Sequence, residues 1–367
     1  MPARPNGAGK STLLRVLTGL LPVHDGFVRL AGRVLDDPGL PPSRTAVLVP
    51  PEQRRIGVVF QDLRLFPHLD VLDNLAYPAR AGGSSRAAAR AGVRTILERL
   101  ELTELATSLP RALSGGQAAR VALGRALARS PELLLLDEPL AALDAGSRLT
   151  IRSRLRDYLA GSHLPGGVIL VTHDPVDALV LADRIVVMEG GRIAQQGAPA
   201  DIARHPRTAY VAGLLGLNLL PGTVAQLSGS TATVTLAGGG TLTGLIGGSD
   251  PGVIGPGELG SRQPGRGEPG VGDPGKWLAV GAPVLVVLRP SAIAVHSNEP
   301  GSGSPRSTWQ ARVSGLDMLT DRVRVTTLGP PDLLIDLTPQ AVIELALAPG
   351  EPVWLSVKAT EVSVFAG

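Results

Sequence analysis

The sequence lacks cysteine altogether, and only three of its 35 basic residues are lysines. Without cysteine there are no disulfides, no thiol catalysis and no cysteine-ligated zinc, and the chain is compatible with a reducing compartment. No apolar run reaches the roughly 18 residues that a membrane-spanning helix needs. The first five residues lack the apolar core of a signal peptide. We therefore expect a cytosolic chain that touches a membrane only through partners.

Net charge gives no indication of a nucleic-acid partner. The formal charge is +3, small for 367 residues, and no lysine- or arginine-rich block interrupts the chain. Hydrophobic residues make up 44% and charged residues 18%, which is typical of a folded protein. The length allows two or more domains, each with its own core.

A glycine-rich turn opens the chain and leads into a helix-like apolar pattern, Leu13–Leu17. Glycines there would let the backbone wrap a phosphate, Lys10 would reach the β- and γ-phosphates, and the Ser11 hydroxyl would bind Mg²⁺. The simpler alternative is a structural turn before a helix. The candidate nucleotide-binding residues are Asn6, Gly7, Ala8, Gly9, Lys10, Ser11 and Thr12.

This turn departs from the usual P-loop pattern at one position. The motif G-x-x-x-x-G-K-[ST] places its first glycine where this chain has Arg4, and only four residues precede Pro5, too few for the expected strand. Either the true start lies upstream and the sequence is truncated or its start misassigned, or the protein has lost that strand. We favour the first interpretation.

A second glycine-rich turn and an acidic pair lie further along the chain. In Leu113-Ser114-Gly115-Gly116-Gln117, Ser114 is a natural N-cap for a helix predicted over 117–129, and free N–H groups at a helix start suit a phosphate. The run Leu133–Leu136 predicts a fully buried parallel strand. It ends in Asp137 and Glu138, two carboxylates that suit Mg²⁺ and a general base. A surface acidic pair would not explain four leucines before it.

On these motifs the chain resembles the ATP-hydrolysing subunit of an ATP-binding-cassette (ABC) transporter, whose signature is LSGGQ and whose Walker B strand ends in Asp-Glu. The resemblance implies an α/β P-loop NTPase fold with a helical subdomain at about 73–130, and ATP and Mg²⁺ as cofactors. It implies that Asp137 holds the Mg²⁺ shell and that Glu138 polarises the attacking water.

Three further segments follow the family's order. Gln61, after the predicted strand Ile56–Phe60, resembles the Q-loop glutamine that contacts the metal and the water, beside the membrane subunit's docking region. Ala141–Asp144 resembles the D-loop, which crosses the dimer interface, and His173 resembles the switch histidine that senses the γ-phosphate. Taken singly, Gln61 could be an ordinary loop residue and His173 a structural one.

The resemblance also implies a homodimer. In the family the signature, here Ser114, Gly115, Gly116 and Gln117, closes over the ATP held by the other subunit, and Asp144 lies at the same interface. One chain therefore does not build a complete site.

Residues 1–210 are assigned to this ATPase domain, and 211–367 to a small all-β domain. Short Val/Leu/Thr alternations between glycines and prolines predict an antiparallel barrel or sandwich, and a helix is expected near Pro339–Leu347 with Thr338 as N-cap. Gly/Pro-rich insertions are expected at about 247–275 and 298–307.

This second half resembles the OB-like TOBE/Mop domain of ABC importers over Asn218–Val224, Leu288–Ile293 and Val353–Val362. The last piece is most similar to the molybdate-type Mop motif. Ser356 and Lys358 stand at i and i+2, on one face of a strand, where both could meet one tetrahedral oxyanion. The alternative is an ordinary amphipathic edge strand.

The resulting hypothesis is an importer ATPase at the cytoplasmic face of the cell membrane, with molybdate or a similar oxyanion as cargo. The expected partners are a second copy of the chain, membrane permease subunits and, indirectly, an extracytoplasmic substrate-binding protein. The alternatives are a sulfate, polyamine or iron importer ATPase, or an oxyanion-binding regulator without hydrolysis if the P-loop is inactive.

Overall fold

The computed structural model describes residues 8–39, 45–141, 148, 152–153, 155–156, 164–247, 278–301 and 307–367. The chain divides into two compact units, one ending at Pro199 and the other beginning at Ala200. The boundary expected at 210/211 falls within helix α9 (Ala209–Leu214) of the second unit. Each unit is described below by itself.

A parallel sheet forms the centre of the first unit, with the order β4 (Ile56–Val59), β5 (Leu133–Asp137) and β6 (Val168–Val171). The four leucines of β5 are buried, because both faces of the strand are covered. Leu134 and Leu136 join a core with the helices, and Leu133 and Leu135 join a second core that includes Leu14. The predicted buried parallel strand is confirmed.

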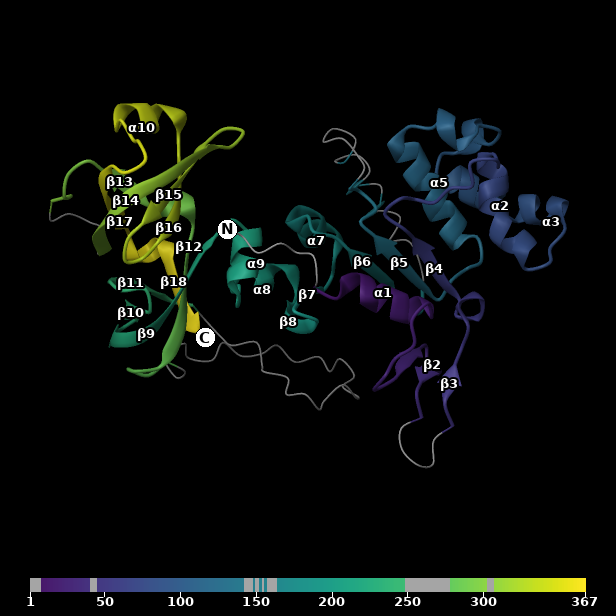
Figure 1. The fold of residues 1–367 in the computed structure, drawn as a ribbon, viewed down its shortest axis with the longest axis horizontal. Helices are drawn as coiled ribbons and strands as arrows, with labels where there is room; N and C mark the ends of the chain where they lie inside the picture. Colours follow the sequence, from purple (N-terminus) through teal and green to yellow (C-terminus); the bar gives the residue numbers. More distant parts are fainter. Residues whose placement is uncertain are drawn as a thin grey trace. The chain divides into compact units, whose positions relative to one another are not determined.

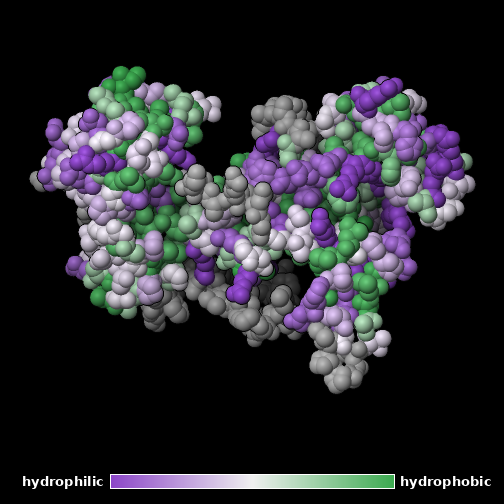
Figure 2. Space-filling model, viewed as in Figure 1, coloured by the Kyte–Doolittle hydropathy of each residue, from purple (hydrophilic) through white to green (hydrophobic). Residues whose placement is uncertain are grey.

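Helices gather on one side of this sheet (Figure 1). They are α2 (Val71–Ala81), α3 (Arg86–Gly92), α4 (Arg94–Arg99) and α5 (Gly115–Leu127), with short 3₁₀ turns at Thr103–Leu105 and Pro110–Ala112. Asp70, Ser85 and Ser114 cap α2, α3 and α5 by accepting a backbone N–H. Helix α3 buries only Ala89, and Figure 2 shows hydrophilic residues mixed with weakly hydrophobic ones in its region. The predicted helical subdomain is confirmed.

The other face of the sheet packs against α1 (Lys10–Thr18) and the strands β1 (Val28–Leu30) and β2 (Arg33–Asp37). The remaining elements of this unit are β3 (Val47–Leu48), a 3₁₀ turn at Pro51–Gln53, α7 (Pro175–Leu181), and the hairpin of β7 (Ile185–Glu189) and β8 (Arg192–Gly197). Residues 148–159, whose sequence favours a helix, lie mostly outside the described residues.

The second unit begins with α8 (Pro199–Arg204) and α9, and continues as an all-β structure. A closed barrel has the order β10-β11-β18-β12-β9, formed by Thr231–Leu236, Thr241–Ile246, Val362–Ala366, Pro283–Leu288 and Asn218–Ser228. The barrel is antiparallel as predicted except at one pair, because β11 and β18 run parallel. These two strands are far apart in sequence, so no tight hairpin dictates an antiparallel direction.

A second sheet completes this unit in the order β13-β17-β14-β15-β16, formed by Ala294–His296, Pro352–Val357, Ser307–Met318, Val323–Leu328 and Leu333–Leu337. It shares one hydrophobic core with the barrel. Asn218 links the two parts: its side-chain amide donates to the Leu334 carbonyl at 2.8 Å and accepts from the Leu334 N–H at 2.8 Å. Helix α10 (Pro339–Glu344) is capped by Thr338 as predicted. The insertion expected at 247–275 lies, apart from Gly247, outside the described residues.

Candidate active site

Helix α1 supplies the first part of the site. Gly9 is its N-cap with φ +90°, a left-handed conformation that favours glycine, and the helix then runs from Lys10 to Thr18. The free N–H groups of this first turn and the positive end of the helix dipole suit an anion. Lys10 is half-buried, whereas Ser11 and Thr12 are exposed. Asn6 and Gly7 lie outside the described residues.

The carboxyl end of β5 supplies the second part. Asp137 is the last residue of the strand and pairs with Val171 of the neighbouring strand β6. Burial raises the pKa of the Asp137 carboxyl, and the nearby Glu138 carboxylate raises it further, whereas Lys10 acts in the opposite direction. Lys10 and Asp137 therefore share one electrostatic environment. A bound cation would relieve the repulsion between the two carboxylates.

Glu138 and His173 are in direct contact. The Glu138 Oε2 lies 2.6 Å from His173 Nδ1, and the side chain of Glu138 is 17% exposed against 58% for His173. Glu138 leaves the strand in a left-handed conformation, φ +48°, and its N–H donates to the Val171 carbonyl at 2.8 Å. The chain turn at the end of β5 thus directs this carboxylate toward the residue that follows the neighbouring strand.

Strand order explains why Gln61 belongs to the same edge. Val59 at the end of β4 pairs with Leu136 of β5, so both strands end at one edge of the parallel sheet. Gln61 follows β4 by two residues and is exposed. The described structure brings Gln61, Asp137, Glu138 and His173 to the carboxyl ends of three adjacent strands.

The signature segment forms a complete capping box at the start of α5. Ser114 Oγ accepts from the Gln117 N–H at 3.3 Å, and Gln117 Oε1 accepts from the Ser114 N–H at 2.8 Å. The helix begins at Gly115, two residues before the prediction, so Gly115 and Gly116 form its first turn. Within the described part of the chain, the interactions that join Lys10, Asp137, Glu138 and His173 do not include this segment.

Two predicted sites remain to be placed. Asp144 lies outside the described residues. In the second unit Ser356 is buried on β17, and its Oγ lies 2.8 Å from His296 Nε2 on the paired strand β13. Strand β17 ends at Val357, and the next residue, Lys358, is exposed with an extended backbone.

Sequence reasoning missed the ion pairs around helix α7, which begins two residues after His173. Arg152 Nε donates to Asp177 Oδ1 at 2.7 Å, and both residues are almost fully buried. Asp174, directly after His173, caps α7 and lies 3.4 Å from Arg148. The Asp-Pro pair at 174–175 is a recognisable helix start and could have revealed the cap. The buried ion pair depends on tertiary packing and has no local signal.

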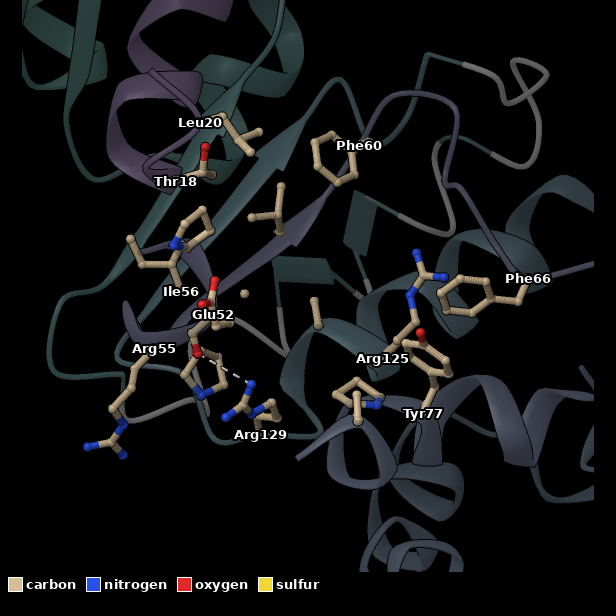
Figure 3. A pocket seen from close by; sticks show the side chains of 17 residues that line it. Thr18, Leu20, Glu52, Arg55, Ile56, Phe60, Phe66, Tyr77, Arg125 and Arg129 are labelled. Atoms are coloured by element: carbon tan, nitrogen blue, oxygen red, sulfur yellow. Dashed lines mark hydrogen bonds between the residues drawn. The ribbon is translucent and has the colours of Figure 1, made fainter. Parts of the chain in front are cut away.

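A cavity of about 600 Å³ lies between the sheet and the helices, away from the carboxylates. Figure 3 shows Phe66, Tyr77 and Arg125 on one side of it, Glu52, Arg55 and Arg129 on the other, and Phe60 between them. Phe60 and Phe66 come from the loop after β4 and Tyr77 from α2, whereas Arg125 is on α5 and Arg129 follows its C-terminal end. This cavity, named the β4–α5 groove below, combines aromatic surface with positive charge.

Comparison with known proteins assigns the family. The ABC transporter family model matches residues 5–141, and the TOBE domain model matches residues 303–364. A molybdenum import ATP-binding protein, ModC, of Mycobacterium tuberculosis is 40% identical over 98% of this chain and 89% of its own length. The chain belongs to the ABC transporter ATP-binding subunits. It is an ABC-type ATPase with a C-terminal TOBE domain, as the motifs predicted.

Other members of the family match a smaller part of the chain. An Fe(3+) ions import ATP-binding protein of Streptomyces avermitilis is 43% identical over 62% of this chain and 62% of its own length. An alpha-glucoside transport ATP-binding protein of Rhizobium meliloti is 40% identical over 65% of this chain and 63% of its own length. In the described ranges of this ABC subunit, no helix combines the length and apolar character of a membrane span.

Proposed function

We propose that this ABC subunit drives the import of an oxyanion, most specifically molybdate. The carrying observation is the extent of its similarity: the ModC relative matches 98% of the chain, second unit included, whereas the iron and glucoside relatives match 62% and 65%. The ATPase unit is shared among importers of many cargoes, so the TOBE unit is the part that separates the candidates. Sulfate, polyamine or iron import is the alternative.

We propose that ATP is held by residues 6–12, with Lys10 on the β- and γ-phosphates. The half-buried Lys10 at the first turn of α1 supports this, because N–H donors and a cation converge there. Ser11, Gln61 and Asp137 would hold Mg²⁺, which neutralises phosphate charge when bound. The environment of Asp137, crowded by Glu138, fits a cation.

Hydrolysis is then attack of water on the γ-phosphate, without a covalent enzyme intermediate. Glu138 accepts the proton of the water, and His173 holds the Glu138 carboxylate through the 2.6 Å contact between Nδ1 and Oε2. Catalysis of this kind is mostly positioning and charge stabilisation. The left-handed turn at Glu138 serves the positioning.

The nucleotide-binding site on one copy is completed by the signature segment of a second copy. Ser114, Gly115, Gly116 and Gln117 would bind the partner's γ-phosphate through the first turn of α5, and Asp144 would lie at the same interface. Support comes from the capping box, which leaves the N–H groups of Gly115 and Gly116 available for a ligand.

The permease would dock in the β4–α5 groove (Figure 3), and a substrate-binding protein would act only through the permease. Aromatic residues beside arginines suit an amphipathic segment with an acidic residue. The groove adjoins the residues after Gln61, so a docked segment would contact the same loop that carries this glutamine.

In the TOBE unit we propose that Ser356 and Lys358 contribute to oxyanion binding. The buried Ser356 hydroxyl beside His296 and the exposed Lys358 ammonium offer both a hydrogen bond and a positive charge. Because Ser356 already contacts His296, an anion would have to share or replace that hydrogen bond.

The test of hydrolysis is Glu138→Gln in the complex with its permease. We expect the variant to bind Mg·ATP and to lose ATP hydrolysis by about a hundredfold or more. Glu132→Gln is the matched control, since Glu132 stands just before the opposite end of β5 and pairs with Arg55 at 2.8 Å. If E138Q hydrolysed ATP like E132Q, the assigned role of Glu138 would be wrong.

The test of cargo is uptake by vesicles holding the reconstituted transporter with its binding protein. Molybdate is expected to enter in an ATP-dependent manner, and sulfate, ferric ion and polyamine are expected not to. Uptake of one of these in place of molybdate would overturn the cargo assignment and leave the ATPase assignment intact.

A further inference from the structure

The loop behind Gln61 holds an unfavourable backbone conformation. Leu63 and Arg64 are consecutive non-glycine residues with φ +56° and +45°. The left-handed region costs a residue with a side chain roughly 1 kcal/mol or more, so two in succession need outside support. Hydrogen bonds within the loop, such as Leu63 N–H to the Phe60 carbonyl at 2.8 Å, shape the turn but do not fix it to the rest of the unit.

Arg125 of helix α5 supplies that support. Its guanidinium donates to the Arg64 carbonyl at 2.6 Å and to the Leu63 carbonyl at 2.9 Å, and it lies 5.1 Å from the centroid of the Phe66 ring. In Figure 3 the side chains of Arg125, Phe66 and Tyr77 lie together on one side of the groove. Burial lowers the pKa of Arg125, and hydrogen bonds from a charged group to carbonyls offset such a penalty.

Asn74 of helix α2 fixes the far end of the same loop. This fully buried side chain accepts from the Phe66 N–H at 2.9 Å and donates to the carbonyls of Phe66 and Leu69 at 3.1 and 2.9 Å. The loop is therefore attached to two helices, through Arg125 at its start and Asn74 at its end. Gln61 and Asp62, between strand β4 and the first attachment, are exposed.

We propose that Arg125 is a positioning residue for ATP hydrolysis: it ties the loop behind Gln61 to helix α5, so that Gln61 and the signature at that helix's start move together. The inference rests on the proposed roles of Gln61 and the signature. Residues Lys10–Thr12 are on a different helix, so loss of the tie changes the placement of Gln61 and leaves nucleotide binding intact.

The experiment compares Arg125→Met and Arg125→Lys with the wild type as full chains. Steady-state hydrolysis gives kcat and KM for Mg·ATP, and a nitroxide on Asp62→Cys reports loop mobility, since the chain has no native cysteine. We expect R125M to lower kcat about tenfold or more, because misplacement by about 1 Å has effects of this size. KM should change less than about twofold, and the nitroxide should become more mobile.

Arg120→Met is the matched control. Arg120 lies on the same helix and has the same charge, but its guanidinium donates to the Leu100 carbonyl at 2.8 Å and lies 3.3 Å from the Glu101 carboxylate, so these contacts do not involve the loop after Gln61. R120M should match the wild type in kcat and in nitroxide mobility. A loss of kcat in R120M equal to that in R125M would show a general charge effect and overturn the inference.

Other outcomes also decide. If the nitroxide in R125M were as immobile as in the wild type, or if KM rose while kcat stayed unchanged, the proposed positioning role of Arg125 would be refuted. If circular dichroism shows that R125M does not fold, R125K is compared with the wild type instead. A lysine ammonium cannot donate to both carbonyls in the geometry of the guanidinium. R125K should therefore show a smaller loss in kcat than R125M and a partly mobile nitroxide. If the wild type failed to hydrolyse ATP, the proposed function itself would be refuted. If the wild type hydrolysed ATP and R125M matched it in kcat and nitroxide mobility, only this inference would be refuted.

Discussion

Replacing Asp73 with asparagine should destabilise the helical part of the ATPase unit. Asp73 lies in the first turn of α2 and is 4% exposed. Its carboxylate accepts from Arg90 Nε at 2.7 Å and from Arg86 at 2.6 Å, so it fastens α3 to α2. Because α3 buries only Ala89 as a side chain of its own, these ion pairs are a large part of what holds the helix in place.

The magnitude follows from the pKa of Asp73. Hydrogen bonds from Arg90, opposed by burial and reinforced by Arg86, lower the pKa from 3.8 to about 2. This difference corresponds to about 2 kcal/mol of stability. Breaking a fully buried ion pair costs about 3–5 kcal/mol, but the side chains of Arg86 and Arg90 are 60% and 33% exposed and can turn to water when the carboxylate is removed. The lower figure is therefore the expected one.

The position of the tryptophans provides the assay. The chain has three, Trp277, Trp309 and Trp354, all beyond Pro199, so tryptophan fluorescence reports the TOBE unit alone. Circular dichroism at the helix band reports chiefly the first unit, which holds α1–α5. In urea at pH 7, D73N should lower the free energy of unfolding by about 2 kcal/mol in the dichroism transition and leave the fluorescence transition unchanged.

The pH dependence of the stability difference between wild type and D73N tests this prediction. A carboxyl whose pKa is lowered on folding stabilises the protein above its unfolded pKa and loses that contribution as pH falls through the folded pKa. The difference between wild type and D73N should therefore be full above about pH 4 and fall to about half near pH 3. A dichroism transition that does not move at pH 7, or a difference that grows on acidification, would refute the reasoning.

Two further changes test other contacts. Asn218→Ala removes both hydrogen bonds to Leu334 and should destabilise the TOBE unit by about 2 kcal/mol in urea, seen in tryptophan fluorescence; an unchanged midpoint would show that these bonds contribute little. Arg152→Met leaves the Asp177 carboxylate buried without its partner and should lower the dichroism stability by about 3 kcal/mol or more at pH 7. Wild-type stability in R152M would contradict the assigned ion pair.

Much of the ATPase unit could be predicted because its signals are local. The leucine run Leu133–Leu136 indicates a strand buried on both faces, and Ser114 before Gly115 indicates a helix start; both are short-range patterns that solvent and backbone hydrogen bonding impose on any chain. The resemblance to the ABC family suggested that Asp137, Glu138 and His173 share a site. The comparisons confirm the family.

The direction in which distant strands pair, and the contacts between side chains of different strands, depend on the tertiary structure. The parallel pairing of β11 with β18 depends on how a distant strand closes the barrel, and no local pattern encodes it. The contact between Glu138 and His173 required two strands to lie side by side in register.

Local sequence patterns specify the chemical groups of this protein and the helices, strands and turns that carry them. Hydrophobic periodicity, capping residues and glycine turns act over a few residues, so they can be recognised without a structure. Tertiary packing sets how groups from distant segments support one another: Arg125 bonds the loop after Gln61, Asn218 joins barrel and sheet, and Arg152 pairs with Asp177. Each of these side chains is defined by partners at least 25 residues away, and long-range packing alone brings such partners together.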